Sequence, residues 1–202
     1  MRNNIFFFEY TMLLNDIFKK YSGPVGTGTV RGTDKATVHS YSEVYEEVFE
    51  SKRDQVISVL EIGVDSGASL AVWADYFPRA HITGIDISLA NWHVGKKNPR
   101  ITCIEGNALS LIPTQKYDII IDDGSHDPED QLKAIEVWSS SLTDQGIMVI
   151  EDVNLKKHPH LGAALKWTAS KYGLECEVRD LRDNNTEKPE DDVIAILTQK
   201  DT

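Results

Sequence analysis

The chain has 202 residues, of which 41% are hydrophobic and 26% are charged, and its formal net charge is −11. This length favours one folded domain, or one with a short appendage, and the composition argues against disorder. The sequence lacks the run of about 18 apolar residues that a membrane-spanning helix needs. An acidic surface repels phosphates and anionic headgroups, so we expect neither nucleic acid nor a membrane as a partner.

The first residues and the cysteines indicate a cytoplasmic protein. The apolar residues 5–8 are followed by Glu9 and by no small-residue cleavage site, unlike a secretory signal peptide. Cys103 and Cys176 stand far apart in apolar, strand-like segments. This placement predicts buried free thiols and excludes a disulfide framework.

The N-terminal quarter differs in pattern from the rest of the chain. Residues 12–20 and 42–51 have helical spacing of apolar side chains, and the glycine-rich residues 22–33 between them predict a mobile connection or lid. We expect the first helix to dock on the body of the protein. The sequence therefore divides into an N-terminal helical segment and lid, residues 1–54, and a core, residues 55–202.

From residue 55 onward, strand and helix patterns alternate. Seven β-branched or apolar runs predict strands, at residues 56–62, 81–87, 100–104, 117–121, 145–150, 174–181 and 192–198. Helical spacing is present at residues 70–77, 128–142 and 161–172. This alternation predicts an α/β fold with a doubly wound, mostly parallel seven-stranded sheet and helices on both faces. Such sheets bind ligands beyond the carboxyl ends of their strands.

The ends of the first two predicted strands suit a nucleoside cofactor. Glu61 precedes the turn at residues 63–67, whose Gly63 would let a ligand approach the backbone. Asp86 ends the next strand, about 20 residues later, where a carboxylate can accept the hydroxyls of a ribose. Asp65 occupies the second glycine position of the dinucleotide pattern, which argues against NAD. A tight turn without a ligand is the structural alternative.

Acidic side chains follow two later strands. Asp123, Glu151 and Asp152 would meet at neighbouring strand ends, and three oxygen donors suit Mg²⁺ better than zinc. His126 is near enough to take a proton from a hydroxyl at the same ion. The structural alternatives are that acids cap helices, as Asp127 can do, and that His126 only hydrogen-bonds its loop.

Four strings resemble a known family. V-L-E-I-G-V-D-S-G-A-S-L at residues 59–70 is similar to the cofactor loop of class I S-adenosylmethionine-dependent methyltransferases. I-D-D-G-S-H at residues 121–126 and V-I-E-D-V at residues 149–153 resemble the metal-dependent macrolide sugar O-methyltransferases of the mycinamicin type and their relatives known as cephalosporin hydroxylases. R-G-T-D-K at residues 31–35, with the later His39 and Tyr41, extends the resemblance over nearly the whole chain.

The resemblance implies a role for ten residues. It implies Mg²⁺ held by Asp123, Glu151 and Asp152, with His126 as general base. The residues expected to hold S-adenosylmethionine are Glu61, Gly63, Gly67, Asp86, Asn107 and Asp122. Two departures are visible: Asn107 stands where many methyltransferases have aspartate, and the side chain of Asp65 must point away from the methionine moiety.

The sequence thus predicts a Mg²⁺-dependent O-methyltransferase of small-molecule biosynthesis. Its acceptor is expected to be a hydroxyl of a sugar or similar diol, such as a glycoside, with residues 23–35 and 156–160 at the substrate rim. The sequence leaves the acceptor, the position methylated and a homo-oligomeric state open. Two other functions also stay open: a nicotinamide-dependent oxidoreductase, and a methyltransferase-like domain that binds cofactor without turnover.

Overall fold

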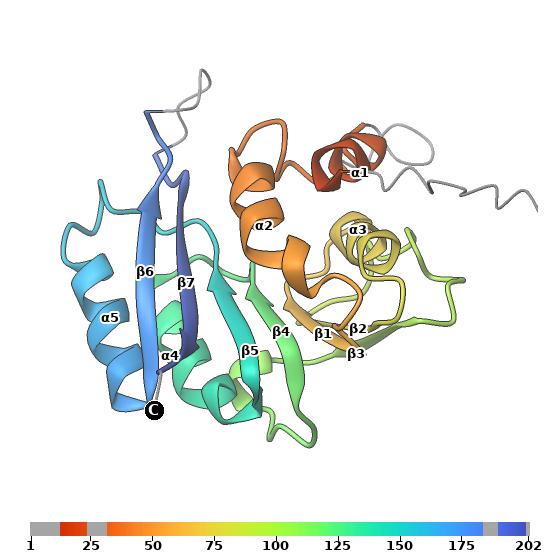
Figure 1. Ribbon diagram of the computed structural model, residues 1–202. Coiled ribbons are helices and arrows are strands. Elements are labelled where there is room, and N and C mark those ends of the chain that lie inside the picture. The colour runs from red at the N-terminus through yellow and green to blue at the C-terminus, as the bar shows by residue number, and fades with distance from the viewer. Residues whose placement is uncertain (1–12, 24–31, 184–189, 201–202) are drawn as a thin grey trace, which may run out of the picture.

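The computed structural model describes residues 13–23, 32–183 and 190–200 (Figure 1). Most of the glycine-rich segment that was predicted to be a lid, residues 24–31, lies outside the described residues. Among the described residues, no helix is long and apolar enough to cross a membrane. Cys103 and Cys176 are free thiols, and both are only partly buried.

The described residues form one seven-stranded sheet, as predicted. Its strands are β1 (Ser58–Ile62), β2 (His81–Asp86), β3 (Ile101–Glu105), β4 (Tyr117–Asp122), β5 (Leu142–Ile150), β6 (Leu174–Asp180) and β7 (Val193–Gln199). They lie in the order β3-β2-β1-β4-β5-β7-β6. The first five strands pair in parallel, whereas β7 is antiparallel to both β5 and β6. The mostly parallel sheet is confirmed, and the insertion of β7 between β5 and β6 is a feature that the strand pattern did not predict.

Helices cover both faces of the sheet (Figure 1). The helices α1 (Leu14–Tyr21), α2 (Tyr41–Phe49) and α3 (Ala68–Tyr76) pack on one face, and α4 (Pro128–Trp138) and α5 (Leu161–Lys171) on the other. Three short 3-10 turns complete the elements: η1 (Glu50–Lys52), η2 (Ala108–Ser110) and η3 (Ser139–Ser141). Parallel strands that are buried on both faces need apolar side chains in both directions, which explains the continuous β-branched runs of the sequence.

Two predicted boundaries differ from the structure near residue 140. The helix predicted to run to residue 142 ends at Trp138, and β5 begins at Leu142 and not at Gln145. Leu142 pairs with Tyr117 before the register of β4 and β5 shifts, so the strand has an irregular start. The polar residues at this start do not show the apolar alternation that identified the other strands.

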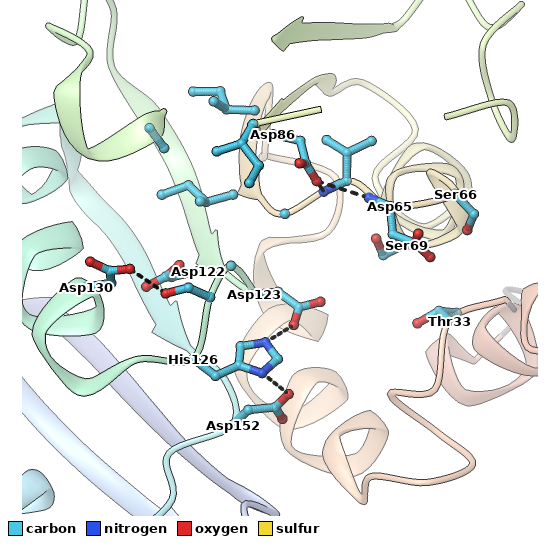
Figure 2. A pocket seen from close by; sticks show the side chains of 18 of the residues that line it. Thr33, Asp65, Ser66, Ser69, Asp86, Asp122, Asp123, His126, Asp130 and Asp152 are labelled. Atoms are coloured by element: carbon cyan, nitrogen blue, oxygen red, sulfur yellow. Dashed lines mark hydrogen bonds and ion pairs between the residues drawn. The ribbon is translucent and has the colours of Figure 1, made fainter. Parts of the chain in front are cut away.

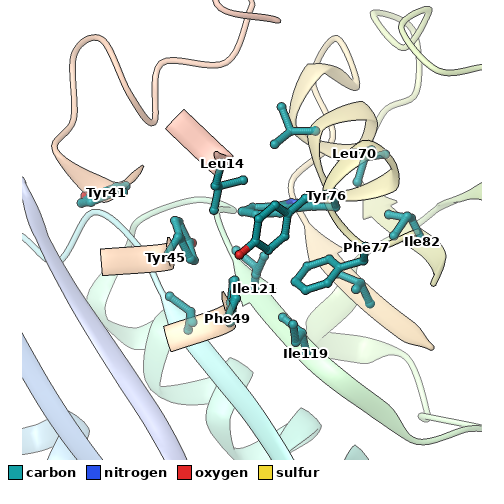
Figure 3. Close-up of a cluster of buried hydrophobic side chains, with 14 of the residues drawn as sticks. Leu14, Tyr41, Tyr45, Phe49, Leu70, Tyr76, Phe77, Ile82, Ile119 and Ile121 are labelled. Atoms are coloured by element: carbon teal, nitrogen blue, oxygen red, sulfur yellow. The ribbon is translucent and has the colours of Figure 1, made fainter. Parts of the chain in front are cut away.

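The N-terminal helices belong to the main core. Phe18 of α1 and Tyr45 and Phe49 of α2 pack around Trp73 of α3. The same cluster contains Ile121 of the sheet, which Figure 3 shows together with Tyr45 and Phe49. The first helix therefore docks on the body of the protein, as expected. The division of the chain at residue 54 stays a prediction.

One glycine brings two loops together at the carboxyl edge of the sheet. Gly63 follows β1 with a φ of 92°, and a Cβ atom there would lie 2.0 Å from the backbone oxygen of Asp123. Any other residue would push the loop after β4 away from β1. Because β1 lies between β2 and β4, this is the point where the chain's crossovers diverge and where such sheets bind ligands.

Candidate functional site

A cavity of about 550 Å³ opens at the carboxyl ends of β1, β2 and β4 (Figure 2). This volume is within the range of small-molecule and cofactor sites. Ile85, Ile87 and Leu109 contribute apolar wall. Seven aspartates also line the cavity: Asp34, Asp65, Asp86, Asp122, Asp123, Asp130 and Asp152. So acidic a wall favours a ligand or ion that carries positive charge.

The glycine turn after β1 is held by Asp86. The Oδ2 atom of Asp86 accepts the backbone N–H of Val64 at 2.7 Å, and its Oδ1 atom accepts that of Ser88 at 3.0 Å. Asp65 adopts a left-handed backbone with a φ of 41°, and its carboxylate accepts a hydrogen bond from Asn91 at 3.1 Å. The carboxylate of Asp65 is thus tied to Asn91, at the rim of the turn.

The residues predicted to hold a cofactor separate into two groups. Gly63, Asp86, Asn107 and Asp122 line the cavity. Glu61 and Gly67 are absent from the lining: Glu61 is fully buried beneath the turn, and Gly67 packs against Trp92. The cofactor roles of all six residues stay predictions.

The sequence placed Lys35 at the end of the predicted substrate rim, residues 23–35, but in the structure it lies buried at the centre of the acidic cluster. Its side chain is 2% exposed, and its Nζ atom lies 2.6 Å from Asp123, 2.5 Å from Glu151 and 3.6 Å from Glu61. The three carboxylates keep the pKa of Lys35 well above its usual value despite its burial, so the side chain is an ammonium ion. The only sequence signal for this residue was its place in the string R-G-T-D-K.

Two tyrosines of α2 bind the acidic pair that follows β5. The hydroxyl of Tyr45 donates to Glu151, and that of Tyr41 donates to Asp152 at 2.6 Å. One carboxylate oxygen of Glu151 therefore accepts a hydrogen bond from Tyr45 and the other accepts one from Lys35, and both of these partners are buried. The amide of Gln131 in α4 donates to the backbone oxygen of Glu151 at 2.8 Å and fixes this strand end from the other face.

Asp123, His126 and Asp152 converge on the cavity (Figure 2). The Nε2 atom of His126 lies 3.2 Å from Asp123, and its Nδ1 atom lies 3.3 Å from Asp152. One ligand atom from each of the three lies within 4.8 Å of the others. His126 and Asp152 have φ values of 58° and 54°. Such left-handed backbone is costly for side chains other than glycine and is concentrated at functional sites.

The charges of this trio depend on one another. Burial opposes ionisation of Asp123, but the Lys35 ammonium and a hydrogen bond from His126 outweigh it and lower the pKa of Asp123 to about 2. The hydrogen bond to Asp123 in turn raises the pKa of His126 to about 9. The imidazole is therefore protonated at neutral pH while it lies between the two carboxylates.

The cluster fits a divalent cation at Asp123 and Asp152. Burial, and then the negative charge of Asp123, raise the pKa of Asp122 to about 7, and burial also raises the pKa of Glu151. Burial is the largest cause of both shifts, and the negative charge of Asp123 adds to each of them. Of the three predicted ligands, Asp123 and Asp152 face the cavity, whereas Glu151 faces Lys35 and Tyr45. The metal roles stay predictions.

Glu61 gives a testable dependence of stability on pH. Burial raises its pKa from 4.5 to about 7, although Lys35 lowers it in part. The folded chain therefore binds more protons than the unfolded chain between about pH 4.5 and pH 7, and this carboxyl lowers stability as the pH rises through that range. We expect Glu61→Gln to reduce this decline. Urea unfolding of both proteins at pH 5, 6, 7 and 8 measures it, and equal slopes would contradict the assignment.

The comparisons with known proteins agree with this architecture. Residues 60–153 match the family model described as a methyltransferase domain. The 8-demethyl-8-alpha-L-rhamnosyl tetracenomycin-C 2'-O-methyltransferase of Streptomyces olivaceus is 30% identical over 148 residues, which are 68% of this chain and 39% of that protein. The mycinamicin VI 2''-O-methyltransferase of Micromonospora griseorubida is 32% identical over 139 residues, 62% of this chain and 34% of that protein.

A solved structure shares the fold. The MycE methyltransferase of the mycinamycin biosynthetic pathway, crystallised with Mg and SAH, aligns with a TM-score of 0.68 at 21% identity, over 93% of this chain and 55% of that one. The chain spans less than two fifths of the length of the two curated relatives. Residues 60–153 thus match a methyltransferase domain model, and the seven-stranded sheet shares its fold with the MycE structure.

Proposed function

We propose that the protein is an S-adenosylmethionine-dependent O-methyltransferase that uses Mg²⁺ and acts on a sugar hydroxyl of a small-molecule glycoside. The observation that carries this proposal is the convergence of Asp123, His126 and Asp152 on an acidic cavity beside the glycine turn. The similarity to sugar O-methyltransferases supports the reaction class, and the family match favours it over the nicotinamide-dependent oxidoreductase.

The cavity fits S-adenosylmethionine in size and charge. Asp86 lines it next to the turn, where its oxygens accept the N–H groups of Val64 and Ser88 and could accept ribose hydroxyls as well. Asn107 lies beyond it, after β3. Ile87 and Leu109 offer apolar surface for an adenine ring. The acidic wall attracts the positively charged sulfonium and ammonium groups of the cofactor. A neutral or anionic nucleoside would be attracted less.

Asp123 and Asp152 would hold the divalent cation. When bound, S-adenosylmethionine supplies an electrophilic methyl group, and the cation supplies positive charge that lowers the pKa of an acceptor hydroxyl. Lys35 and Tyr41 keep the two carboxylates in place, so these oxygens need little rearrangement. Glu151 would have to exchange its bonds to Lys35 and Tyr45 before it could serve as a third ligand.

His126 is the proposed proton acceptor. Its ring lies between the two carboxylates that would hold the cation. Their negative charge keeps the imidazole in its protonated form. Once that charge is shared with a cation, a neutral imidazole can take the proton of the acceptor hydroxyl at a ring nitrogen. A site that holds the acceptor oxygen and the donor methyl group together would supply further acceleration by positioning.

A transfer assay tests the proposal. The protein is incubated with labelled S-adenosylmethionine, Mg²⁺ and a panel of glycosides that carry free vicinal hydroxyls, with each aglycone alone as the matched control. We expect label in the sugar, loss of transfer with EDTA, and recovery with excess Mg²⁺. Transfer that is insensitive to EDTA would contradict the metal. Cofactor binding without product for any glycoside would support the non-catalytic alternative.

A further inference from the structure

The hydroxyl of Thr33 is an unused donor in the wall of the cavity. Thr33 lies in the segment before α2, is 8% exposed, and lines the cavity. Its backbone N–H donates to Tyr21 at 3.1 Å, but its Oγ1 atom has no hydrogen-bond partner among the described residues. A buried hydroxyl without a partner has lost its hydrogen bonds to water and has formed no others, which costs free energy. A bound ligand that accepts a hydrogen bond from this hydroxyl would remove that cost.

The other hydroxyls of the wall are engaged to different degrees. Ser125 donates to Asp130 at 2.6 Å, and Ser69 is hydrogen-bonded to Glu61. Ser66 accepts a hydrogen bond from the backbone N–H of Ala68 at 3.4 Å, so its own hydroxyl proton can still be donated to a ligand. Figure 2 shows the Thr33 oxygen turned toward the interior of the cavity, on the side of Ser66 and Ser69 and away from Asp122 and Asp130.

This distribution of donors restricts where an anionic group can bind. The cavity wall is rich in carboxylates, so a ligand carboxylate is repelled wherever no donor faces it. Thr33 and Ser66 supply hydroxyl donors near the start of α3, and Asn107 lies at the other side of the site, after β3. A ligand that lays its ribose at Asp86 therefore extends its amino-acid end from the turn toward Thr33.

Resting on the proposed function, we propose that the Thr33 hydroxyl donates a hydrogen bond to the carboxylate of the methionine moiety of the methyl donor. Thr33 is thus a specificity-determining residue for the amino-acid part of the cofactor. A hydrogen bond to a charged group in a buried site is among the stronger ones, so its loss is expected to weaken binding about tenfold or more.

Two nucleosides separate this role from general packing. S-adenosylhomocysteine carries the carboxylate, whereas 5'-methylthioadenosine keeps the adenosine and sulfur but lacks the amino-acid group. Calorimetry with Thr33→Val is expected to show about tenfold or greater loss of affinity for S-adenosylhomocysteine and less than about twofold change for 5'-methylthioadenosine. Thr33→Ser, which keeps the hydroxyl, is expected to retain most of the affinity for both nucleosides.

The stability of the variant provides a second readout. Valine has the shape of threonine, and removal of an unpartnered buried hydroxyl is neutral or stabilising, so the melting temperature of ligand-free Thr33→Val should not fall. Equal effects on the two nucleosides, or none, would overturn the proposal for Thr33 while leaving the proposed function intact. If the unaltered protein binds neither nucleoside, the proposed function fails, and the role of Thr33 fails with it.

Discussion

Replacing Lys35 with methionine is expected to lower the free energy of unfolding by about 3–5 kcal/mol. The substitution keeps the length of the side chain and removes its charge. It leaves Glu61 and Glu151 buried, and Asp123 partly buried, without the ammonium that lies 2.5–3.6 Å from each of them. Unpaired buried charges are costly, whereas the intact cluster need not be strongly stabilising compared with an apolar core.

Urea unfolding at pH 8 measures this loss, and Lys20→Met is the matched control. Lys20 lies 2.7 Å from Asp75 at the surface, where an ion pair contributes at most about 1 kcal/mol. We expect a smaller loss for Lys35→Met at pH 6, because Glu61, whose pKa is about 7, can then be neutralised by a proton. A Lys35 variant as stable as the Lys20 variant at pH 8 would show that the cluster does not need this cation.

Replacing Asp152 with asparagine is expected to weaken Mn²⁺ binding and to lower kcat/KM by about 100-fold each. Asparagine preserves an acceptor for the hydroxyl of Tyr41, which lies 2.6 Å from the carboxylate, so the local structure is retained. It removes the negative charge that, with Asp123, makes the site suitable for a hard divalent ion. The free Mn²⁺ signal in electron paramagnetic resonance gives the affinity without reference to turnover.

Two further variants locate the ion. Asp144→Asn changes an exposed carboxylate of β5 far from the cavity lining and is expected to leave Mn²⁺ affinity unchanged. Glu151→Gln is expected to reduce Mn²⁺ affinity less than Asp152→Asn does, because Glu151 faces Lys35 and Tyr45. If a folded Glu151→Gln variant lost as much Mn²⁺ affinity as Asp152→Asn or more, Glu151 would be a metal ligand, as the sequence predicted.

The periodicity of the sequence was sufficient for the sheet and for the edge where the site lies. Strands β1, β2 and β4 each contain a short run rich in apolar or β-branched residues, and a glycine or a carboxylate stands at or directly after its end, so these strand ends could be read from local patterns. The antiparallel insertion of β7 could not, because β7 has an apolar run like those of the parallel strands. Strand order is decided by long-range pairing, which local patterns do not record.

The same distinction applies to the acidic cluster. The sequence determined that Asp123, Glu151 and Asp152 come to one edge of the sheet, because each follows a parallel strand. The tertiary structure decided which way each carboxylate faces: Lys35, 88 residues from Asp123 in the chain, enters from the segment before α2 and turns Glu151 inward. The charge balance of a buried site depends on which charged side chains the fold brings next to it. When such a side chain lies far away in the sequence, no local pattern of residues records the contact.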